Sequence, residues 1–252
     1  MLNGRADMIL IVDAGNTDVN FFVYDDKKIV YQDRLMTKRD DLSDYYYSLV
    51  HKISLCGFRI DGYIISSVVP LITDHLVDTL RSVFKMDGLV VNSVLVSDLK
   101  IELDNRDELG ADLIATTYGV MAKYELPAIV ADLGTATKIS IISKDKVFQG
   151  GIIVPGVSIA KKAMELMIPH LPVIEPILPD RLINRDTIKS MQAGLLYGTI
   201  HQVRSLVLAV EEEMGFKATK ILTGGYSRFI NHKLPEFIYD ETLLNDGLLA
   251  IY

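Results

Sequence analysis

The sequence predicts an α/β protein made of two halves with the same organisation. Strand-like and helical patterns alternate along the chain, and a sequence segment near the start recurs close to the middle of the chain. "ILIVDAGNTDVNFFVYDDKKIVYQ" aligns with "AIVADLGTATKISIISKDKVFQG", which places Asp13 over Asp132, 119 residues later. Solenoid repeats run about 20 to 50 residues, so this longer repeat indicates two domains, 1–118 and 119–252. Its apolar-Asp-x-Gly centre is short enough to recur by chance, and the match of the strands that follow argues against chance.

The first half begins with a predicted hairpin and continues with helices and strands in alternation. β-branched and aromatic residues flank its Gly-Asn-Thr turn, as they do in paired strands. One helical face is predicted from the spacing of Leu42, Tyr46, Leu49, Val50 and Ile53. The pattern predicts strands at 9–12, 20–24 and 27–35, a helix at 42–55, a buried strand at 61–70, a helix at 71–84 and strand material at 88–97.

The second half repeats the opening hairpin and adds a long helix. Residues 188–215 form an amphipathic pattern that ends at Gly215, the usual position of a helix stop. Its apolar stripe suits either the core or a subunit interface. A third glycine turn, "ILTGGYS" at 221–227, follows an apolar strand and precedes a predicted helix, and its flat Gly-Gly surface would suit an adenine or ribose.

The composition indicates a soluble globular protein and excludes several functional classes. The 252 residues are 49% hydrophobic, enough for one large core or two small ones, and carry a formal net charge of −7. An acidic chain without a basic run is not built for nucleic acid, whose binding surfaces gather Lys and Arg. Cys56 is the single cysteine, so an internal disulfide or multi-cysteine metal site is excluded. No apolar run is long enough for a signal peptide or a membrane span, so we expect a cytoplasmic protein.

The turn after Asp13 has the composition of a phosphate-binding loop. Gly15 lets backbone amides approach a ligand closely, and Asn16 and Thr17 add side-chain donors. Asp13 alone would repel phosphate, but a Mg²⁺ ion or its water shell between them makes the arrangement favourable. Taken alone, these residues also suit an ordinary hairpin with a structural aspartate. The second copy at Asp132 favours phosphate binding, and the motifs of P-loop, Rossmann, serine hydrolase and zinc peptidase sites are absent from the sequence.

The order of several short motifs resembles that of the type III pantothenate kinases. They are "DAGNT", "LGAD", "DLGTAT", "GGIIVPGV", "MQAGLLYG" and "LTGG", and the resemblance runs from about Ile9 to Tyr252. This family belongs to the superfamily of acetate and sugar kinases, Hsc70 and actin. The resemblance implies two RNase-H-like (actin-like ATPase) domains related by duplication, with a nucleotide cleft between them. It also implies transfer of the ATP γ-phosphoryl group to pantothenate, the first step of coenzyme A biosynthesis, by a homodimer that needs Mg²⁺ and K⁺ or NH₄⁺.

The resemblance assigns roles to individual residues, motif by motif. Asp112 in "GADL" matches the proposed general base, and Asp132 matches a monovalent-cation ligand. The expected acceptor contacts are Gly110, Ala111, Leu113 and Thr187. The expected ATP contacts are Asp13, Ala14, Gly15, Asn16, Thr17, Asp18, Val19, Asn20, Gly134, Thr135, Gly224 and Gly225, with Asp13 also holding Mg²⁺ through water. Because phosphoryl transfer is loose, Asp112 would chiefly orient the hydroxyl and accept its proton late.

Departures from the family pattern gather on the acceptor side. Leu113 stands where the family usually has an arginine that pairs with the pantothenate carboxylate, and Leu103 and Arg106 replace an aromatic residue and a proline. Losing that guanidinium should weaken binding by roughly 1.5–3 kcal/mol unless Arg106 or Arg185 replaces it. In the second phosphate turn, Lys138 stands where the family commonly has a threonine.

Three interpretations therefore stay open from the sequence. The chain is a pantothenate kinase, a related small-alcohol kinase with another acceptor, or a nucleotide-binding regulatory protein without an acceptor. Leu113 could equally be an ordinary apolar residue that packs a helix.

Overall fold

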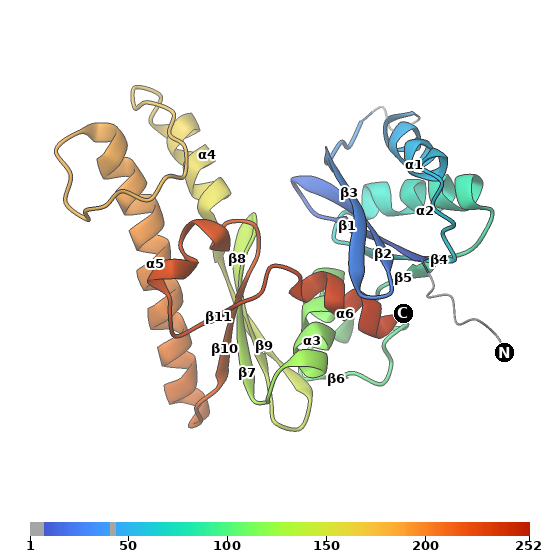
Figure 1. The fold of residues 1–252 in the computed structure, drawn as a ribbon. Helices are drawn as coiled ribbons and strands as arrows, with labels where there is room; N and C mark the ends of the chain where they lie inside the picture. Colours follow the sequence, from blue (N-terminus) through green and yellow to red (C-terminus); the bar gives the residue numbers. More distant parts are fainter. Residues whose placement is uncertain (1–7, 41–43) are drawn as a thin grey trace. The chain divides into compact units, whose positions relative to one another are not determined.

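The computed structural model describes residues 8–40 and 44–252, which form two compact units. Unit 1 consists of the described residues of Met1–Asp98 together with Asn105–Gly119 and Leu244–Tyr252. Unit 2 consists of Leu99–Asp104 and Val120–Leu243. Figure 1 labels the elements of both units. The limits 1–118 and 119–252 stay a prediction about the duplicated halves.

Unit 1 contains a five-stranded sheet in the order β3-β2-β1-β4-β5. The predicted opening hairpin is present, because β1 pairs with β2 antiparallel, and β1 also pairs with β4 in parallel. The bounds are β1 Met8–Ala14, β2 Asp18–Asp25, β3 Lys28–Met36, β4 Gly62–Ser67 and β5 Leu89–Val90. Two helices, α1 (Tyr45–Leu55) and α2 (Pro70–Phe84), contribute apolar side chains to the same core as these strands.

The predicted face of the first helix is confirmed for its described residues. Tyr46, Leu49, Val50 and Ile53 are all buried in α1. Leu42, the other member of this face, lies outside the described residues. A core of this kind stabilises the helix more than its intrinsic propensity does.

The predicted strand at 88–97 is wrong beyond its first residues, since β5 ends at Val90. Asn92 explains the early end. Its side-chain oxygen accepts hydrogen bonds from the amides of Val94 (3.0 Å) and Leu95 (2.9 Å). These two amides are hydrogen-bonded within the local turn, so they do not donate to an adjacent strand.

Unit 2 contains a six-stranded sheet in the order β11-β10-β7-β8-β9-β6. The bounds are β6 Lys100–Ile101, β7 Ala128–Leu133, β8 Ala136–Ile142, β9 Val147–Pro155, β10 Thr219–Thr223 and β11 Ile238–Tyr239. Leaving β6 aside, the third, second, first, fourth and fifth strands follow one another across this sheet as they do in unit 1. This shared order confirms the duplication that the sequence repeat predicts.

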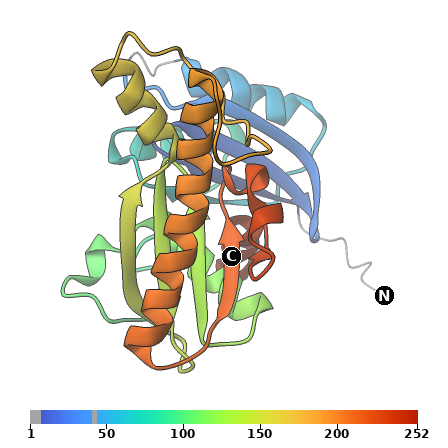
Figure 2. The ribbon, with the colours of Figure 1, turned by 90° about the vertical axis from the view of Figure 1, so that its left-hand side faces the viewer.

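The long predicted helix is α5 (Thr187–Met214), and its stop at Gly215 is confirmed, with a φ of 70°. Figure 2 shows α5 running along the second sheet, beside α4 (Val157–Met167). Its apolar stripe, which includes Leu196, Ile200, Val203 and Val207, belongs to the core of unit 2. The sequence left core and interface as alternatives for this stripe, and the structure assigns it to the core.

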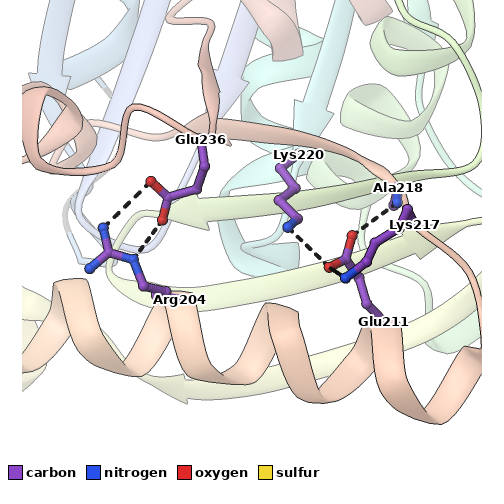
Figure 3. A network of polar contacts seen from close by, with 6 residues as sticks. All are labelled: Arg204, Glu211, Lys217, Ala218, Lys220 and Glu236. Atoms are coloured by element: carbon purple, nitrogen blue, oxygen red, sulfur yellow. Dashed lines mark hydrogen bonds and ion pairs between the residues drawn. The ribbon is translucent and has the colours of Figure 1, made fainter.

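The end of α5 is fixed by a buried carboxylate, shown in Figure 3. Glu211 accepts hydrogen bonds from the Ala218 amide (3.0 Å) and the Lys217 ammonium (3.0 Å) and lies 3.0 Å from the Lys220 ammonium. Burial alone would raise the pKa of the Glu211 carboxyl, but these partners outweigh burial and hold that pKa below its ordinary value. Nearby, Arg204 pairs with Glu236 (2.6 Å).

Two further helices, α3 (Ala111–Lys123) and α6 (Leu243–Ile251), complete the fold. They approach closely within unit 1, since a Cβ atom on Gly247 would lie 1.7 Å from the Ala115 carbonyl oxygen. A glycine is therefore required at this crossing. In the described part of the chain, no helix is both long enough and apolar enough to span a membrane.

Candidate functional site

The first glycine turn, Gly15–Thr17, connects β1 to β2 and is held from two sides. The Gly15 amide donates to the Asp18 carbonyl oxygen (2.9 Å), which closes the turn. From the chain after β3, the Thr37 hydroxyl donates to the Gly15 carbonyl oxygen (2.6 Å), and the Thr37 amide donates to that of Thr17 (2.8 Å). Asn16 and Thr17 remain exposed at the tip. The turn is therefore rigid at its base and accessible at its tip, as a phosphate-binding loop requires.

The predicted ATP contacts around this turn divide into two kinds. Ala14 and Val19 are buried in the sheet, so only their main chain could reach a ligand. Asp13, Asp18 and Asn20 are partly exposed, and Asp13 faces Asn20 across the hairpin. Asp18 lies 3.7 Å from Arg34. Of these side chains, Asp13 offers a carboxylate closest to the start of the turn.

Asp13 supplies one carboxylate near the first glycine turn and, within the part of the chain that the structure describes, is not part of a complete metal site. A carboxylate is the kind of oxygen donor that Mg²⁺ prefers, and Mg²⁺ usually keeps several waters and bridges to phosphates. Among the described residues, no group of three or more His, Cys, Asp or Glu side chains could hold a metal ion. Asp13 could therefore hold a nucleotide-bound ion, directly or through water, without forming a complete metal site.

The second glycine turn, Gly134 and Thr135, connects β7 to β8 and is one residue shorter than the first. Asp132 occupies the place in β7 that Asp13 occupies in β1. Its cross-strand partner is Lys138, and the Lys138 Nζ atom lies 3.1 Å from Asp132 Oδ2. The carboxylate that resembles a monovalent-cation ligand thus already has an ammonium group against it.

The third glycine turn, which follows β10, packs against Asp132 near the end of β7. Gly224 has a φ of 89°, and a Cβ atom there would lie 2.4 Å from Asp132 Oδ1. Gly225 is exposed and has open space around it. The helix predicted after this turn is present only as two short 3-10 helices, η2 (Ser227–Phe229) and η3 (Asn231–Lys233). The Tyr226 amide donates instead to the Leu133 carbonyl oxygen (3.0 Å), which turns the chain back onto β7.

Asp112 lies in the first turn of α3, in unit 1, with its side chain partly exposed. Its Oδ1 atom accepts a hydrogen bond from the Leu113 amide (2.8 Å), as carboxylates at helix starts commonly do. A Cβ atom on Gly110 would lie 2.8 Å from this oxygen, so the glycine leaves room for the carboxylate.

A pocket of about 390 Å³ is lined in part by the residues that precede Asp112 in the sequence, and Asp112 itself is not among its lining residues. Its lining combines the end of β4, the loop after β5 and the start of α3: Ser67, Val91, Asn92, Ser93, Val94, Asp107, Leu109, Gly110 and Ala111. Two predicted acceptor contacts, Gly110 and Ala111, are therefore pocket-lining residues. The lining contains polar groups and small apolar groups, which suits a small polar molecule.

The candidate replacements for the family arginine lie in different units. Arg106 belongs to η1 (Arg106–Glu108) in unit 1, and its Nη2 atom donates to the carbonyl oxygens of Ser93 (3.2 Å) and Val96 (2.7 Å). Arg106 thereby holds the loop that lines the pocket. Arg185 is exposed in unit 2, close in sequence to Thr187, which is also exposed at the first position of α5. Leu113 is partly exposed.

Two residues at the first turn were missed by the sequence reasoning. Thr37 holds the turn by two hydrogen bonds, and the Arg39 guanidinium donates to the Asn16 side-chain oxygen (2.9 Å). Both follow β3, about twenty residues after the turn they contact. Only the predicted third strand, which returns beside the hairpin, could have drawn attention to the segment that follows it.

Comparison with known proteins identifies close relatives over nearly the whole chain. The family model described as type III pantothenate kinase matches residues 9–209. A type III pantothenate kinase of Exiguobacterium sibiricum is 36% identical over 97% of this chain and 98% of its own length. One from Halalkalibacterium halodurans is 34% identical, with the same coverage of both chains.

Solved structures with low sequence identity share the fold. A conserved Baf family transcriptional activator from Campylobacter jejuni has a TM-score of 0.63 at 20% identity, covering 96% of each chain. A 2-dehydro-3-deoxygalactonokinase protein from Sinorhizobium meliloti has a TM-score of 0.58 at 10% identity, covering 96% of this chain and 95% of that one. MreB5 of Spiroplasma citri, solved with AMPPNP, has a TM-score of 0.57 at 10% identity, covering 96% and 94%. These likenesses confirm a two-domain actin-like fold.

Proposed function

The chain belongs to the type III pantothenate kinase family, and we propose that Asp112 and the pocket lined by the residues before it carry the acceptor side of the reaction. The protein is an ATP-dependent kinase that phosphorylates pantothenate, the first step of coenzyme A biosynthesis. One observation supports the placement of the acceptor more than any other: a partly exposed carboxylate directly follows two residues that line a pocket of about 390 Å³.

Asp112 orients the acceptor in this proposal. The primary hydroxyl oxygen of pantothenate attacks the γ-phosphorus, the bond from that phosphorus to the β,γ-bridging oxygen breaks, and ADP leaves. A carboxylate is a weak base for a free alcohol, but in a loose transition state the hydroxyl loses its proton late, so Asp112 accepts it as the new bond forms. Holding the hydroxyl in line contributes more to the rate than basicity does.

The first turn binds phosphate in this proposal. The amides of Gly15–Thr17 and the exposed side chains at its tip donate to phosphate oxygens, and Thr37 keeps the base of the turn in place. Asp13 would hold a divalent ion, which would supply positive charge to neutralise the phosphates. Gly134 and Thr135 take the corresponding part in unit 2, with Gly224 and Gly225 as nucleoside contacts. The Asp132 carboxylate lies 3.1 Å from the Lys138 ammonium.

The acceptor carboxylate must be recognised without the family arginine, because Leu113 takes that position. Arg106, in unit 1, donates to the carbonyl oxygen of Ser93 in the pocket-lining loop. We propose that it supplies the positive charge for the pantothenate carboxylate. Arg185 and Thr187 stay predicted acceptor contacts in unit 2.

A coupled ADP-release assay with Mg²⁺ and ATP, with and without pantothenate, tests the reaction. We expect pantothenate-dependent ADP that is lost in Asp112→Asn. Asp74→Asn, an exposed carboxylate on α2 in the same unit, is the matched control and should keep full activity. ADP release with another small alcohol only would favour a different acceptor. Nucleotide binding by calorimetry without any turnover would favour a regulatory protein.

We also propose that the protein is a homodimer that acts in the cytoplasm. Large apolar side chains are exposed along α4 and the segment between α4 and α5, among them Leu166, Met167, Val173, Ile177, Leu182 and Ile183. Soluble monomers rarely expose large apolar patches, so this many exposed apolar side chains in one segment favour a subunit interface. Sedimentation should give a dimer that Ile183→Asp converts to a monomer. Leu55→Asp, at an exposed leucine of α1, should leave the dimer intact.

A further inference from the structure

Lys138 and Asp132 form an ion pair at the second phosphate turn. They face each other across the β7–β8 hairpin, with 3.1 Å between Lys138 Nζ and Asp132 Oδ2. Only 17% of the Lys138 side chain and 14% of the Asp132 side chain are exposed. Long side chains lose conformational freedom when they are held in this way, and a pair so shielded from water is screened little by salt. The contact is therefore a fixed part of the turn.

The first hairpin has no such cation at the matching position. There Asp13 faces Asn20, a neutral amide. An ungapped alignment of the repeat places Lys138 over Val19, but the shorter second turn brings Lys138 to the place of Asn20. Two hairpins of one topology thus differ in charge at one structural position. The difference is specific to unit 2, where the resemblance implies a monovalent cation.

Both oxygens of the Asp132 carboxylate have close neighbours. Asp132 Oδ2 is already in contact with the Lys138 ammonium. A Cβ atom added to Gly224 would lie 2.4 Å from Asp132 Oδ1, so the space between this oxygen and that side of Gly224 is too small for a further atom. A lysine ammonium is a compact single positive charge, so it offers the carboxylate what K⁺ or NH₄⁺ would offer. An added cation would meet a like charge at contact distance.

We propose that the Lys138 ammonium is a built-in substitute for the monovalent cation, and that this kinase binds nucleotide and turns over without K⁺ or NH₄⁺. The proposal rests on the nucleotide-binding role proposed for the second turn. Lys138 acts as a positioning residue, because it neutralises Asp132 and keeps the charge at the phosphate turn constant whatever salt is present.

Calorimetry with ADP and Mg²⁺, in KCl and in tetramethylammonium chloride of equal ionic strength, tests this proposal. The wild type should bind with affinities that agree within about twofold in the two salts. Lys138→Thr should bind at least about tenfold more weakly in tetramethylammonium and recover in KCl. Lys138→Gln removes the charge and keeps a long side chain, and it is the replacement variant for both measurements if Lys138→Thr folds poorly. Lys144→Ala removes an exposed lysine of the same unit and should behave as the wild type.

A second measurement does not depend on nucleotide. K⁺ should raise the melting temperature of Lys138→Thr and Lys138→Gln relative to tetramethylammonium, because the ion can then bind Asp132, and it should leave the wild type unchanged.

Two results would overturn the proposal: wild-type affinity that drops tenfold without K⁺, or lysine variants that are indifferent to K⁺ in both measurements. Wild-type turnover of pantothenate that requires K⁺ would contradict this proposal and leave the proposed function standing. Absence of nucleotide binding by the wild type in both salts would contradict the nucleotide-binding turns themselves, and this proposal with them.

Discussion

Gly224 lies against Asp132 so closely that a methyl group on the glycine would come within 2.4 Å of the carboxylate. The same glycine has a φ of 89°, which L-amino acids with a side chain rarely adopt. The third glycine turn therefore packs against Asp132 near the end of β7, just before the second glycine turn. A substitution at Gly224 should affect the position of Asp132 as well.

Gly224→Ala should therefore both destabilise unit 2 and displace Asp132. We expect a loss of about 1–3 kcal/mol in the free energy of unfolding, from backbone strain and the close contact. Nucleotide affinity should fall as well. Gly225→Ala is the matched control for the stability loss alone, since its Cβ would meet open space and its φ is not positive, while Gly225 is itself a proposed nucleoside contact. Urea unfolding measures the stability loss, and calorimetry with ADP measures the affinity of the Gly224 variant against the wild type. Equal unfolding free energies of the two variants would contradict the packing of Gly224 described here.

Thr37→Val should loosen the first phosphate turn. The variant keeps the size of the side chain and the amide bond to Thr17 but loses the hydroxyl that donates to Gly15 (2.6 Å). One hydrogen bond contributes about 0.5–1.5 kcal/mol, so the KM for ATP should rise between about twofold and tenfold. The KM for pantothenate serves as the internal control and should not move. A change in the pantothenate KM alone would show that Thr37 serves the acceptor instead.

Leu113→Arg should give little gain in acceptor binding while Arg106 is present, because Arg106 is proposed to supply the positive charge already. In an Arg106→Gln background a charge-assisted pair from the new guanidinium should contribute about 1.5–3 kcal/mol, which corresponds to a pantothenate KM lower by a factor of about 10 to 150. Leu113→Gln in the same background, with a similar length and no charge, should give little gain. Steady-state kinetics at saturating ATP measure the change. A gain of about tenfold from Leu113→Arg with Arg106 intact would contradict the role proposed for Arg106.

Glu211 should make the stability of unit 2 depend on acidity. Burial acts to raise the pKa of this carboxyl, but its amide and ammonium partners lower that pKa below the ordinary value. A depressed pKa contributes stability that is complete above the unfolded-state pKa, about 4.3, and is lost as pH falls through the lower folded-state pKa. Glu211→Gln should cost about 1–3 kcal/mol at pH 7. This difference should shrink below pH 4.

Glu212→Gln, at the exposed neighbouring position, is the control for charge alone. Its unfolding free energy should stay within about 0.5 kcal/mol of the wild type. A Glu211→Gln penalty that stays constant from pH 7 to pH 3 would mean that the loss comes from packing and not from the ionised carboxylate.

The two equivalent hairpins and the candidate residues could be predicted from the sequence because they depend on local patterns. The apolar runs before Asp13 and Asp132 and the glycines after them identify two equivalent hairpins. Their repetition indicates a duplicated topology, which both sheets confirm. The early end of β5 was not predictable in the same way. It depends on whether the amides of Val94 and Leu95 donate hydrogen bonds to the Asn92 side chain or to a neighbouring strand. Strand propensity alone does not decide that competition.

The sequence by itself determined the family, the duplicated halves and the chemistry of the carboxylates, since side-chain type and spacing are enough for these. Only the tertiary structure decided which groups meet across strands and loops. A single residue fewer in the second turn shifts the register of the hairpin and brings Lys138, rather than Thr137 or Ile139, to face Asp132. Thr37 reaches the first turn only because β3 returns beside the hairpin. Such contacts depend on register and chain return, which no short motif encodes.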